Sequence, residues 1–266
     1  MHPEEIRDDL RCRATHPAPN GILSPMTITF MGDSLTAGNL GIPFLRYLPR
    51  PSGRHFVNRG KDGDTVRGLL SRLGDALAAD VPDIVVLEAG ANDILLPEMA
   101  ARGGAWTPFV EEMTASGSVP TPDPEEFADL YARLLSAAAV GAARRVVAMT
   151  IPPIGENLES ARNRRRSELN RRIRRAVENA EERNRRVHLA DAAAAFESAL
   201  RESPLRSDHF FGEPGDFAAD ARRIRRDRNA EALSKERGLL LTMDGAHLNE
   251  KGAKMAAGIL NEALGG

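Results

Sequence analysis

Met26-Thr27-Ile28-Thr29-Phe30-Met31-Gly32-Asp33-Ser34-Leu35-Thr36-Ala37-Gly38 is the stretch that decides the fold. Its first six residues form a short, largely apolar run, which predicts a buried strand. The run ends in a glycine, and Ser34 stands in the turn that follows, among small residues that leave room for a substrate. A hydroxyl at such a position is a candidate nucleophile, provided that the rest of the chain supplies a base.

Strand-like runs and helical patterns alternate after this stretch. We expect further strands at 55–58, 84–87, 145–151 and 187–191. Between and after them we expect helices that carry Val66 to Leu77 at helical spacing, then 125–140, about 160–184 and about 250–264. Alternation of this kind predicts a parallel sheet with helices on both faces, a three-layer α/β/α domain with right-handed crossovers.

The organisation of the chain is expected to be simple. Its 266 residues suffice for one core and do not require two domains. Residues 1–24 contain several breakers and are expected to form an N-terminal extension. Residues 25–266 are expected to form a single domain, with insertions near 101–122 and 203–235.

Composition limits the classes of partner. The hydrophobic fraction of 42% and the charged fraction of 28% are ordinary for a globular protein, and the net charge of −2 argues against a general nucleic-acid or membrane-surface binder. Cys12 is the single cysteine, so no intrachain disulfide can form. Met1 to Arg13 is too charged for a secretory signal, and no apolar run has membrane-spanning length. We therefore expect a cytoplasmic protein without stable membrane insertion.

A candidate base lies far downstream of Ser34, in Asp244-Gly245-Ala246-His247. His247 could take the serine proton, and Asp244 could accept a hydrogen bond from the imidazole and so orient it. The alternative is that Asp244 only caps the turn before the helix at 250–264. Taken alone, this pair would favour the capping role.

Donors for an oxyanion are also available after the predicted strands. The side-chain amide of Asn92, the backbone N–H of Gly60 and the backbone N–H of Ser34 are the candidates. Each has an ordinary alternative role, since Asn92 could be a helix N-cap and Gly60 a turn glycine. All three nevertheless fall at the carboxyl ends of predicted strands, where ligands bind in such sheets.

Four blocks of this sequence, taken in order, resemble the signature blocks of the SGNH (GDSL) hydrolase family. They are Gly32-Asp33-Ser34-Leu35, Gly60, Gly90-Ala91-Asn92-Asp93 and Asp244-Gly245-Ala246-His247. The resemblance runs from about Met26 to the C-terminus. It implies a flavodoxin-like sheet of five parallel strands. It also implies Ser34 as nucleophile, His247 as base, Asp244 as the third triad member, and an oxyanion hole of Ser34, Gly60 and Asn92.

The function expected from these features is hydrolysis of carboxylic esters with small or medium acyl groups, without a metal or an organic cofactor. A thioesterase or a carbohydrate O-deacetylase would use the same machinery and stays open as an alternative. A flavodoxin-like module whose turn at 33–38 binds phosphate is an alternative from another class, although it leaves Asn92, Asp244 and His247 without a role. A catalytically silent interaction protein is disfavoured because every expected catalytic position is filled.

Other features have two interpretations each. The eleven arginines from Arg162 to Arg186 could form an anion-binding or nucleic-acid-binding patch. The apolar stripe and glutamates of the same segment favour a solvated helix face instead. Asp33 and Asp93 are interpreted as loop-organising residues. Asp208 with His209 is a weaker catalytic candidate than the pair at 244–247. Trp106, Phe109, Phe210 and Phe211 in the two insertions could line a substrate pocket or form a lid, and they could equally anchor the loops or an oligomer interface.

Overall fold

The computed structural model describes residues 25–204, 207–227 and 230–265, so the extension expected at 1–24 lies outside the described residues. Its centre is a five-stranded sheet in the order β2-β1-β3-β4-β5, with every pair of neighbours parallel. This is the flavodoxin-like order, so the predicted fold class is confirmed. The strands are β1 (Met26–Gly32), β2 (Arg54–Gly60), β3 (Ile84–Glu88), β4 (Arg145–Met149) and β5 (Val187–Ala190).

The two faces of the sheet belong to two separate apolar cores. Along β3, Val85 and Leu87 pack into one core, and Ile84 and Val86 pack into the other. Every residue of this strand is buried, because helices cover both faces. A strand with one face in solvent alternates apolar and polar residues, but β3 has no such face. This explains the continuous apolar run of Ile84 to Leu87.

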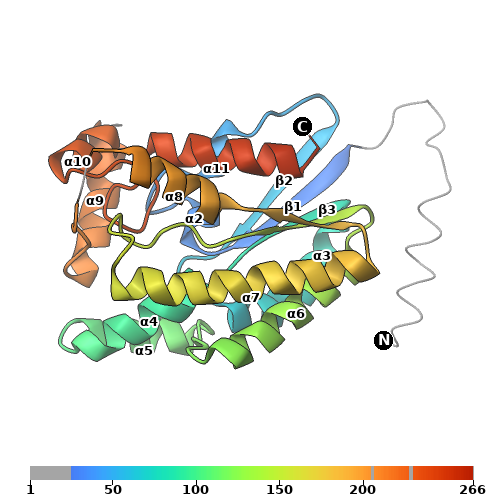
Figure 1. Ribbon diagram of the computed structural model, residues 1–266, viewed down its shortest axis with the longest axis horizontal. Coiled ribbons are helices and arrows are strands. Elements are labelled where there is room, and N and C mark those ends of the chain that lie inside the picture. The colour runs from blue at the N-terminus through green and yellow to red at the C-terminus, as the bar shows by residue number, and fades with distance from the viewer. Residues whose placement is uncertain (1–24, 205–206, 228–229, 266) are drawn as a thin grey trace.

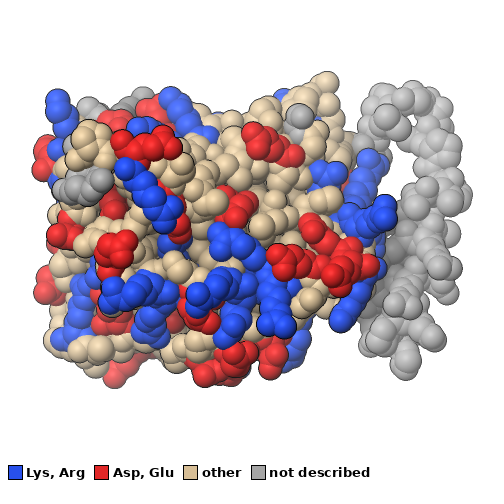
Figure 2. Space-filling model, in the orientation of Figure 1, with Lys and Arg blue, Asp and Glu red and all other residues tan. Residues whose placement is uncertain are grey.

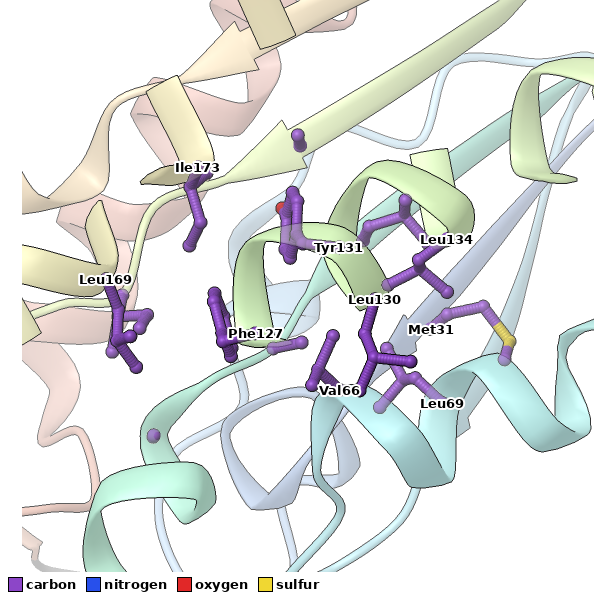
Figure 3. Close-up of a cluster of buried hydrophobic side chains, with 14 of the residues drawn as sticks. Met31, Val66, Leu69, Phe127, Leu130, Tyr131, Leu134, Leu169 and Ile173 are labelled. Carbon is purple, nitrogen blue, oxygen red and sulfur yellow. The ribbon is translucent and has the colours of Figure 1, made fainter. Parts of the chain in front are cut away.

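Helices form the outer layers (Figure 1). One core is covered by α3 (Val66–Asp80), α6 (Pro124–Gly141) and α7 (Ala161–Arg183), and Figure 3 shows their buried side chains meeting. Phe127, Tyr131 and Leu134 of α6 lie at the centre of this layer and are fully buried. The opposite core is covered by the 3-10 helix η1 (Phe44–Tyr47), α8 (Ala192–Glu202) and α11 (Glu250–Ala263).

Several helices were not expected. A short helix α2 (Ser34–Ala37) follows β1, and α4 (Ala91–Arg102) follows β3. The region expected as a first insertion contains α5 (Trp106–Ala115). The described part of the second contains α9 (Pro214–Asp227) and α10 (Ala230–Glu236). These two regions are therefore largely helical.

The arginine-rich helix α7 lies among carboxylates. Arg162 is paired with Glu98 at 2.6 Å, Arg172 with Glu168 at 3.0 Å and Arg174 with Asp191 at 2.9 Å. Figure 2 shows blue and red side chains interspersed over this face of the molecule. Much of the positive charge of α7 is thus compensated locally.

Candidate active site

Ser34 lies where the central strand β1 meets α2. Asp33 is the N-cap of this helix, and its Oδ1 accepts the N–H of Leu35 at 2.9 Å. Ser34 is the first helical residue, and its own N–H meets no acceptor in the described part of the chain. The turn therefore presents both a hydroxyl and an unpaired N–H donor at the carboxyl end of the sheet.

His247 and Asp244 lie beside Ser34, as the sequence suggested. Nε2 of His247 is 3.2 Å from Oγ of Ser34, and Nδ1 is 2.6 Å from Oδ2 of Asp244. The other carboxylate oxygen, Oδ1, accepts the N–H groups of Ala246 and His247 at 2.8 and 2.7 Å. Gly245, at φ 95°, lets the turn close. A proton on Nδ1, facing the carboxylate, leaves Nε2 as an acceptor for the serine hydroxyl.

The pair is buried, and its members stabilise each other's charge. Burial alone would raise the pKa of Asp244, but the His247 ring and the two backbone N–H donors hold that pKa below its ordinary value. Burial likewise opposes a charged imidazole, yet the Asp244 carboxylate raises the pKa of His247 above its ordinary value. The site therefore favours proton uptake by His247, as a general base requires.

Asn92 lies in the first turn of α4 and lines the same pocket as Ser34. Its Nδ2 donates to the carbonyl oxygen of Asp64 at 2.9 Å and to Oδ2 of Asp33 at 3.2 Å. The amide is thus held in a fixed orientation in the pocket that Ser34 lines.

Gly60 is not placed as expected. It is the last residue of β2, its N–H donates to Oδ1 of Asn58 at 2.8 Å, and it does not line the pocket. Glycine is required there for packing, because a Cβ would lie 2.2 Å from the backbone nitrogen of Ala37. Gly63, in the next turn, lines the pocket with Ser34, and within the described residues its N–H has no acceptor. Its φ of 76° also favours glycine, and its position beyond the strand end is the signal that sequence reasoning missed.

A mostly apolar pocket opens beside Ser34 and His247. Its volume is about 290 Å³, and its wall includes side chains from α4, from α5 and from the segment after β4. Among the described lining residues there is no lysine or arginine. The apolar wall includes Leu95, Leu96, Met99, Phe109, Ile154 and Phe217.

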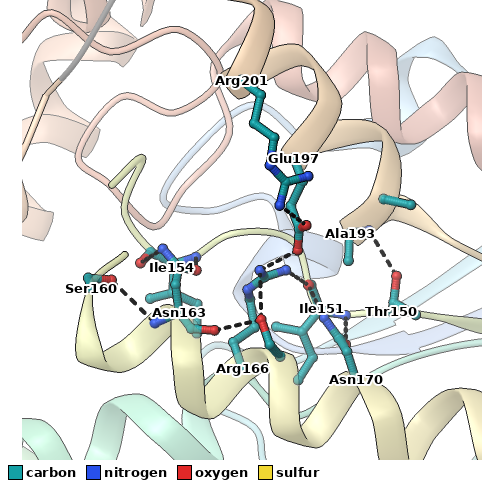
Figure 4. Close-up of polar contacts among 12 residues, drawn as sticks. Thr150, Ile151, Ile154, Ser160, Asn163, Arg166, Asn170, Ala193, Glu197 and Arg201 are labelled. Atoms are coloured by element: carbon teal, nitrogen blue, oxygen red, sulfur yellow. Dashed lines mark hydrogen bonds and ion pairs between the residues drawn. The ribbon is translucent and has the colours of Figure 1, made fainter. Parts of the chain in front are cut away.

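Two asparagines of α7 hold the wall formed by residues 151–154 (Figure 4). The amide of Asn170 accepts the N–H of Ile151 at 2.8 Å and donates to its carbonyl oxygen at 2.9 Å. Asn163 does the same for Ile154, at 3.0 and 3.1 Å. An irregular segment is thereby given fixed backbone partners, so the pocket wall is rigid without being a strand or helix.

The aromatic residues of the two unexpected helical regions both line the pocket and anchor the fold. Phe109, Phe211 and Phe217 line the pocket, and the ring of Phe217 meets that of His247 edge-on at 5.4 Å. Trp106 is buried against all three phenylalanine rings and donates from Nε1 to the carbonyl oxygen of residue 212 at 3.0 Å. Both interpretations of these aromatics therefore apply.

Other candidates have structural contacts. The carboxylate of Asp93 accepts the N–H of Val66 at 3.0 Å and that of Thr121 at 2.8 Å, and burial raises its pKa to about 7. Asp208 accepts a hydrogen bond from Asn157 at 2.6 Å. The described residues contain no cluster of histidine, cysteine, aspartate or glutamate arranged to hold a metal ion. No helix of residues 25–204, 207–227 and 230–265 is long and apolar enough to cross a membrane.

A parallel α/β/α sheet with a hydroxyl and an imidazole beside an apolar pocket at its carboxyl rim is typical of ester hydrolases. The chain belongs to the GDSL-like lipase/acylhydrolase family, whose model matches residues 30–255. It is therefore a carboxylic-ester hydrolase.

Solved structures share the fold of this chain. LAE5, described as an alpha/beta hydrolase enzyme from the metagenome of Lake Arreo, Spain, has 19% identity and a TM-score of 0.57, over 92% of this chain and 97% of that chain. An acetylxylan esterase, Axe2 from Geobacillus stearothermophilus, has 18% identity and a TM-score of 0.60, over 92% and 96%. At these identities the likeness shows the fold alone. Among curated proteins the sequence has no significant match.

Proposed function

We propose that the protein hydrolyses esters through a triad of Ser34, His247 and Asp244. The observation that supports this triad is the continuous chain of hydrogen bonds from Oγ of Ser34 through the imidazole of His247 to the buried carboxylate of Asp244. For the oxyanion hole we propose the N–H groups of Ser34 and Gly63 and the amide of Asn92. Gly63 takes the place expected for Gly60, because the N–H of Gly60 already has an acceptor.

In this mechanism Oγ of Ser34 attacks the acyl carbonyl carbon while Nε2 of His247 takes the hydroxyl proton. Asp244 stabilises the imidazolium that forms. The carbonyl oxygen becomes an oxyanion, which the three donors stabilise. The imidazolium then protonates the leaving alcohol, and the acyl group remains on Ser34. A water molecule, deprotonated by His247, attacks the acyl-enzyme by the same route and releases the acid.

The pocket favours a medium-length aliphatic acyl group. Its wall of leucine, methionine, isoleucine and phenylalanine side chains offers apolar contact beyond what an acetyl group can use. The absence of lysine and arginine from its described lining disfavours a phosphate ligand. A medium-chain thioesterase is the second candidate, since its acyl group would use the same wall. An O-deacetylase acting on acetylated sugars, such as the acetylxylan esterase Axe2, would leave most of the wall unused.

We also propose that residues 25–266 act as one hydrolase domain in which the stretches at 101–122 and 203–235 supply part of the acyl-binding wall, beside α4 and the segment after β4. Phe109 and Met113 come from the first stretch, and Phe211 and Phe217 come from the second. Substrate choice would then depend on these added segments, and the chemistry on the rim of the sheet.

The test is hydrolysis of p-nitrophenyl esters and acyl thioesters by the wild type and by Ser34→Ala. We expect Ser34→Ala to lose ester hydrolysis and labelling by a fluorophosphonate while its circular dichroism spectrum stays unchanged. Ser71→Ala is the matched control, because within the described residues the Ser71 hydroxyl donates only to the carbonyl oxygen of Gly68. Full hydrolysis by Ser34→Ala would contradict the proposed nucleophile, and activity confined to acetylated sugars would contradict the acyl preference.

A further inference from the structure

The turn that carries Ser34 rests on a buried carboxyl group of the neighbouring strand. Glu88 ends β3, and its Oε2 accepts hydrogen bonds from the Asp33 N–H at 3.0 Å and from the Thr36 hydroxyl at 3.1 Å. Gly32 permits this approach, because a Cβ there would lie 2.7 Å from Oε2 of Glu88. Glu88 thus holds residues on both sides of Ser34.

Asp33 extends this hydrogen-bonded chain to the oxyanion donor Asn92. Its Oδ1 is occupied by the N–H of Leu35, and its Oδ2 accepts from Nδ2 of Asn92 at 3.2 Å. The same Nδ2 donates to the carbonyl oxygen of Asp64 at 2.9 Å, so two acceptors fix the amide plane. A developing oxyanion on the substrate can share the N–H of the longer bond as a second acceptor, so Asp33 still holds the amide while the oxyanion forms.

We propose that Asp33 and Glu88 are positioning residues for ester hydrolysis: Glu88 fixes the turn of the nucleophile, and Asp33 aims the Asn92 amide at the oxyanion. The inference rests on the proposed function, since it needs Ser34 to form the oxyanion. Neither carboxyl group touches the substrate in this scheme. Both act through the groups that they hold.

The charges around the pair support this role. Burial raises the pKa of Asp33 well above its ordinary value, and the charge of the nearby Glu88 carboxyl raises that pKa further. Burial also raises the pKa of Glu88. The nearby carboxylate of Asp64 is paired with Arg72 at 2.7 Å, and the buried hydroxyl of Tyr131 lies in the field of Glu88.

The two residues call for different conservative variants. Both side-chain oxygens of Asp33 accept hydrogen bonds, so Asp33→Asn must lose either the cap on Leu35 or the contact with Asn92. Only Oε2 of Glu88 accepts from the turn, and Oε1 has no partner in the described residues. Glu88→Gln therefore keeps an oxygen for the turn, whereas Glu88→Ala removes it.

The test measures kcat and KM separately with p-nitrophenyl octanoate as substrate. For kcat, the enzyme concentration is taken as the fraction of protein that a fluorophosphonate labels. We expect Asp33→Asn to lower kcat by about 10²-fold with KM nearly unchanged, as for loss of one oxyanion donor. Glu88→Ala should also lower kcat by about 10²-fold, because a small misplacement of the reacting groups has an effect of this size. Glu88→Gln should keep most of the wild-type kcat. Asp191→Asn is the matched control, because Asp191 is likewise an N-cap directly after a strand, but away from the pocket.

A double-mutant cycle keeps the proposal testable even where single variants lose stability. If Asp33 acts through the Asn92 amide, Asp33→Asn should cost little kcat once Asn92→Ala is present. Additive losses, an unchanged kcat in Asp33→Asn, an equal loss in Asp191→Asn, or Glu88→Gln as impaired as Glu88→Ala would each overturn the inference. Activity in Ser34→Ala would instead overturn the proposed function, so the two failures are distinguishable.

Discussion

Met99→Trp should shorten the acyl chain that the enzyme prefers, because Met99 lines the pocket about two helical turns beyond Asn92 on α4. Asn92 and Met99 both line the pocket from α4. Their seven-residue separation along a helix corresponds to about 10 Å, at 1.5 Å per residue. An extended acyl chain advances about 1.3 Å per carbon, given bonds near 1.5 Å. About eight carbons therefore span the distance from the oxyanion donor to Met99.

The volume of the pocket leads to a similar length. About 290 Å³ holds about ten methylene-sized groups, if each occupies roughly the 30 Å³ of a water molecule. Each buried methylene contributes about 0.8 kcal/mol, which is a factor of about four in kcat/KM. We therefore expect kcat/KM of the wild type to rise about fourfold per methylene from acetate to octanoate and then to level off.

The assay is the rate of p-nitrophenol release across esters of two to twelve acyl carbons. In Met99→Trp the increase of kcat/KM with chain length should stop near butyrate or hexanoate. The kcat/KM for the acetate ester should stay close to that of the wild type. Met99→Leu is the matched control, since it conserves volume and should keep the wild-type profile. Identical chain-length profiles for Met99→Trp and the wild type, or a wild-type optimum at acetate, would refute the reasoning.

Three further predictions concern the base, the pH dependence of stability and the support of the site. Asp244→Asn should lower kcat by about 10⁴-fold and move the acidic limb of the pH–rate profile to lower pH, because the carboxylate raises the pKa of His247; a limb that stays in place would contradict this. The pKa of Asp93 is about 7 when folded. Its carboxyl therefore stabilises the folded state at low pH, and we expect urea unfolding to show a decreasing free energy between about pH 4 and 7, a slope that Asp93→Asn should reduce. Glu156→Ala removes the acceptor of three backbone N–H groups at 240–242 and should cost about 1–3 kcal/mol, seen as a lower thermal midpoint; an unchanged midpoint would argue against that role.

The sequence predicted the sheet because each strand is a short apolar run with a clear end. Buried strands need no polar face, so the largely apolar runs at 84–87 and 145–151 clearly indicate strands. The helix α4 was missed for the same physical reason: its residues from Ala91 to Leu96 are all buried, so no amphipathic period marks it, and Pro97 lies inside it. Periodicity detects elements that have a solvent face, and α4 has almost none in its first two turns.

The site was predictable where chemistry restricts the residue type and less so where only the backbone matters. Ser34, Asp244 and His247 carry distinctive side chains, and the structure brings them together. Gly60 and Gly63 are identical in type and three residues apart, and only the end of β2 distinguishes them. The role proposed for Glu88 has no signal in the sequence either, because a glutamate that ends a buried strand finds its partners only after the strands pair.

The contact between Ser34 and His247 joins residues that are 213 positions apart, and this affects the order of assembly. The strands are complete at Ala190, whereas the histidine and α11 come later in the chain. At roughly 5–20 residues per second of synthesis, a nascent chain holds all its strands about 3–11 s before the histidine is added. During that interval the growing polypeptide contains the Ser34 turn but not His247, so the proposed triad cannot form until the last part of the chain has been synthesised.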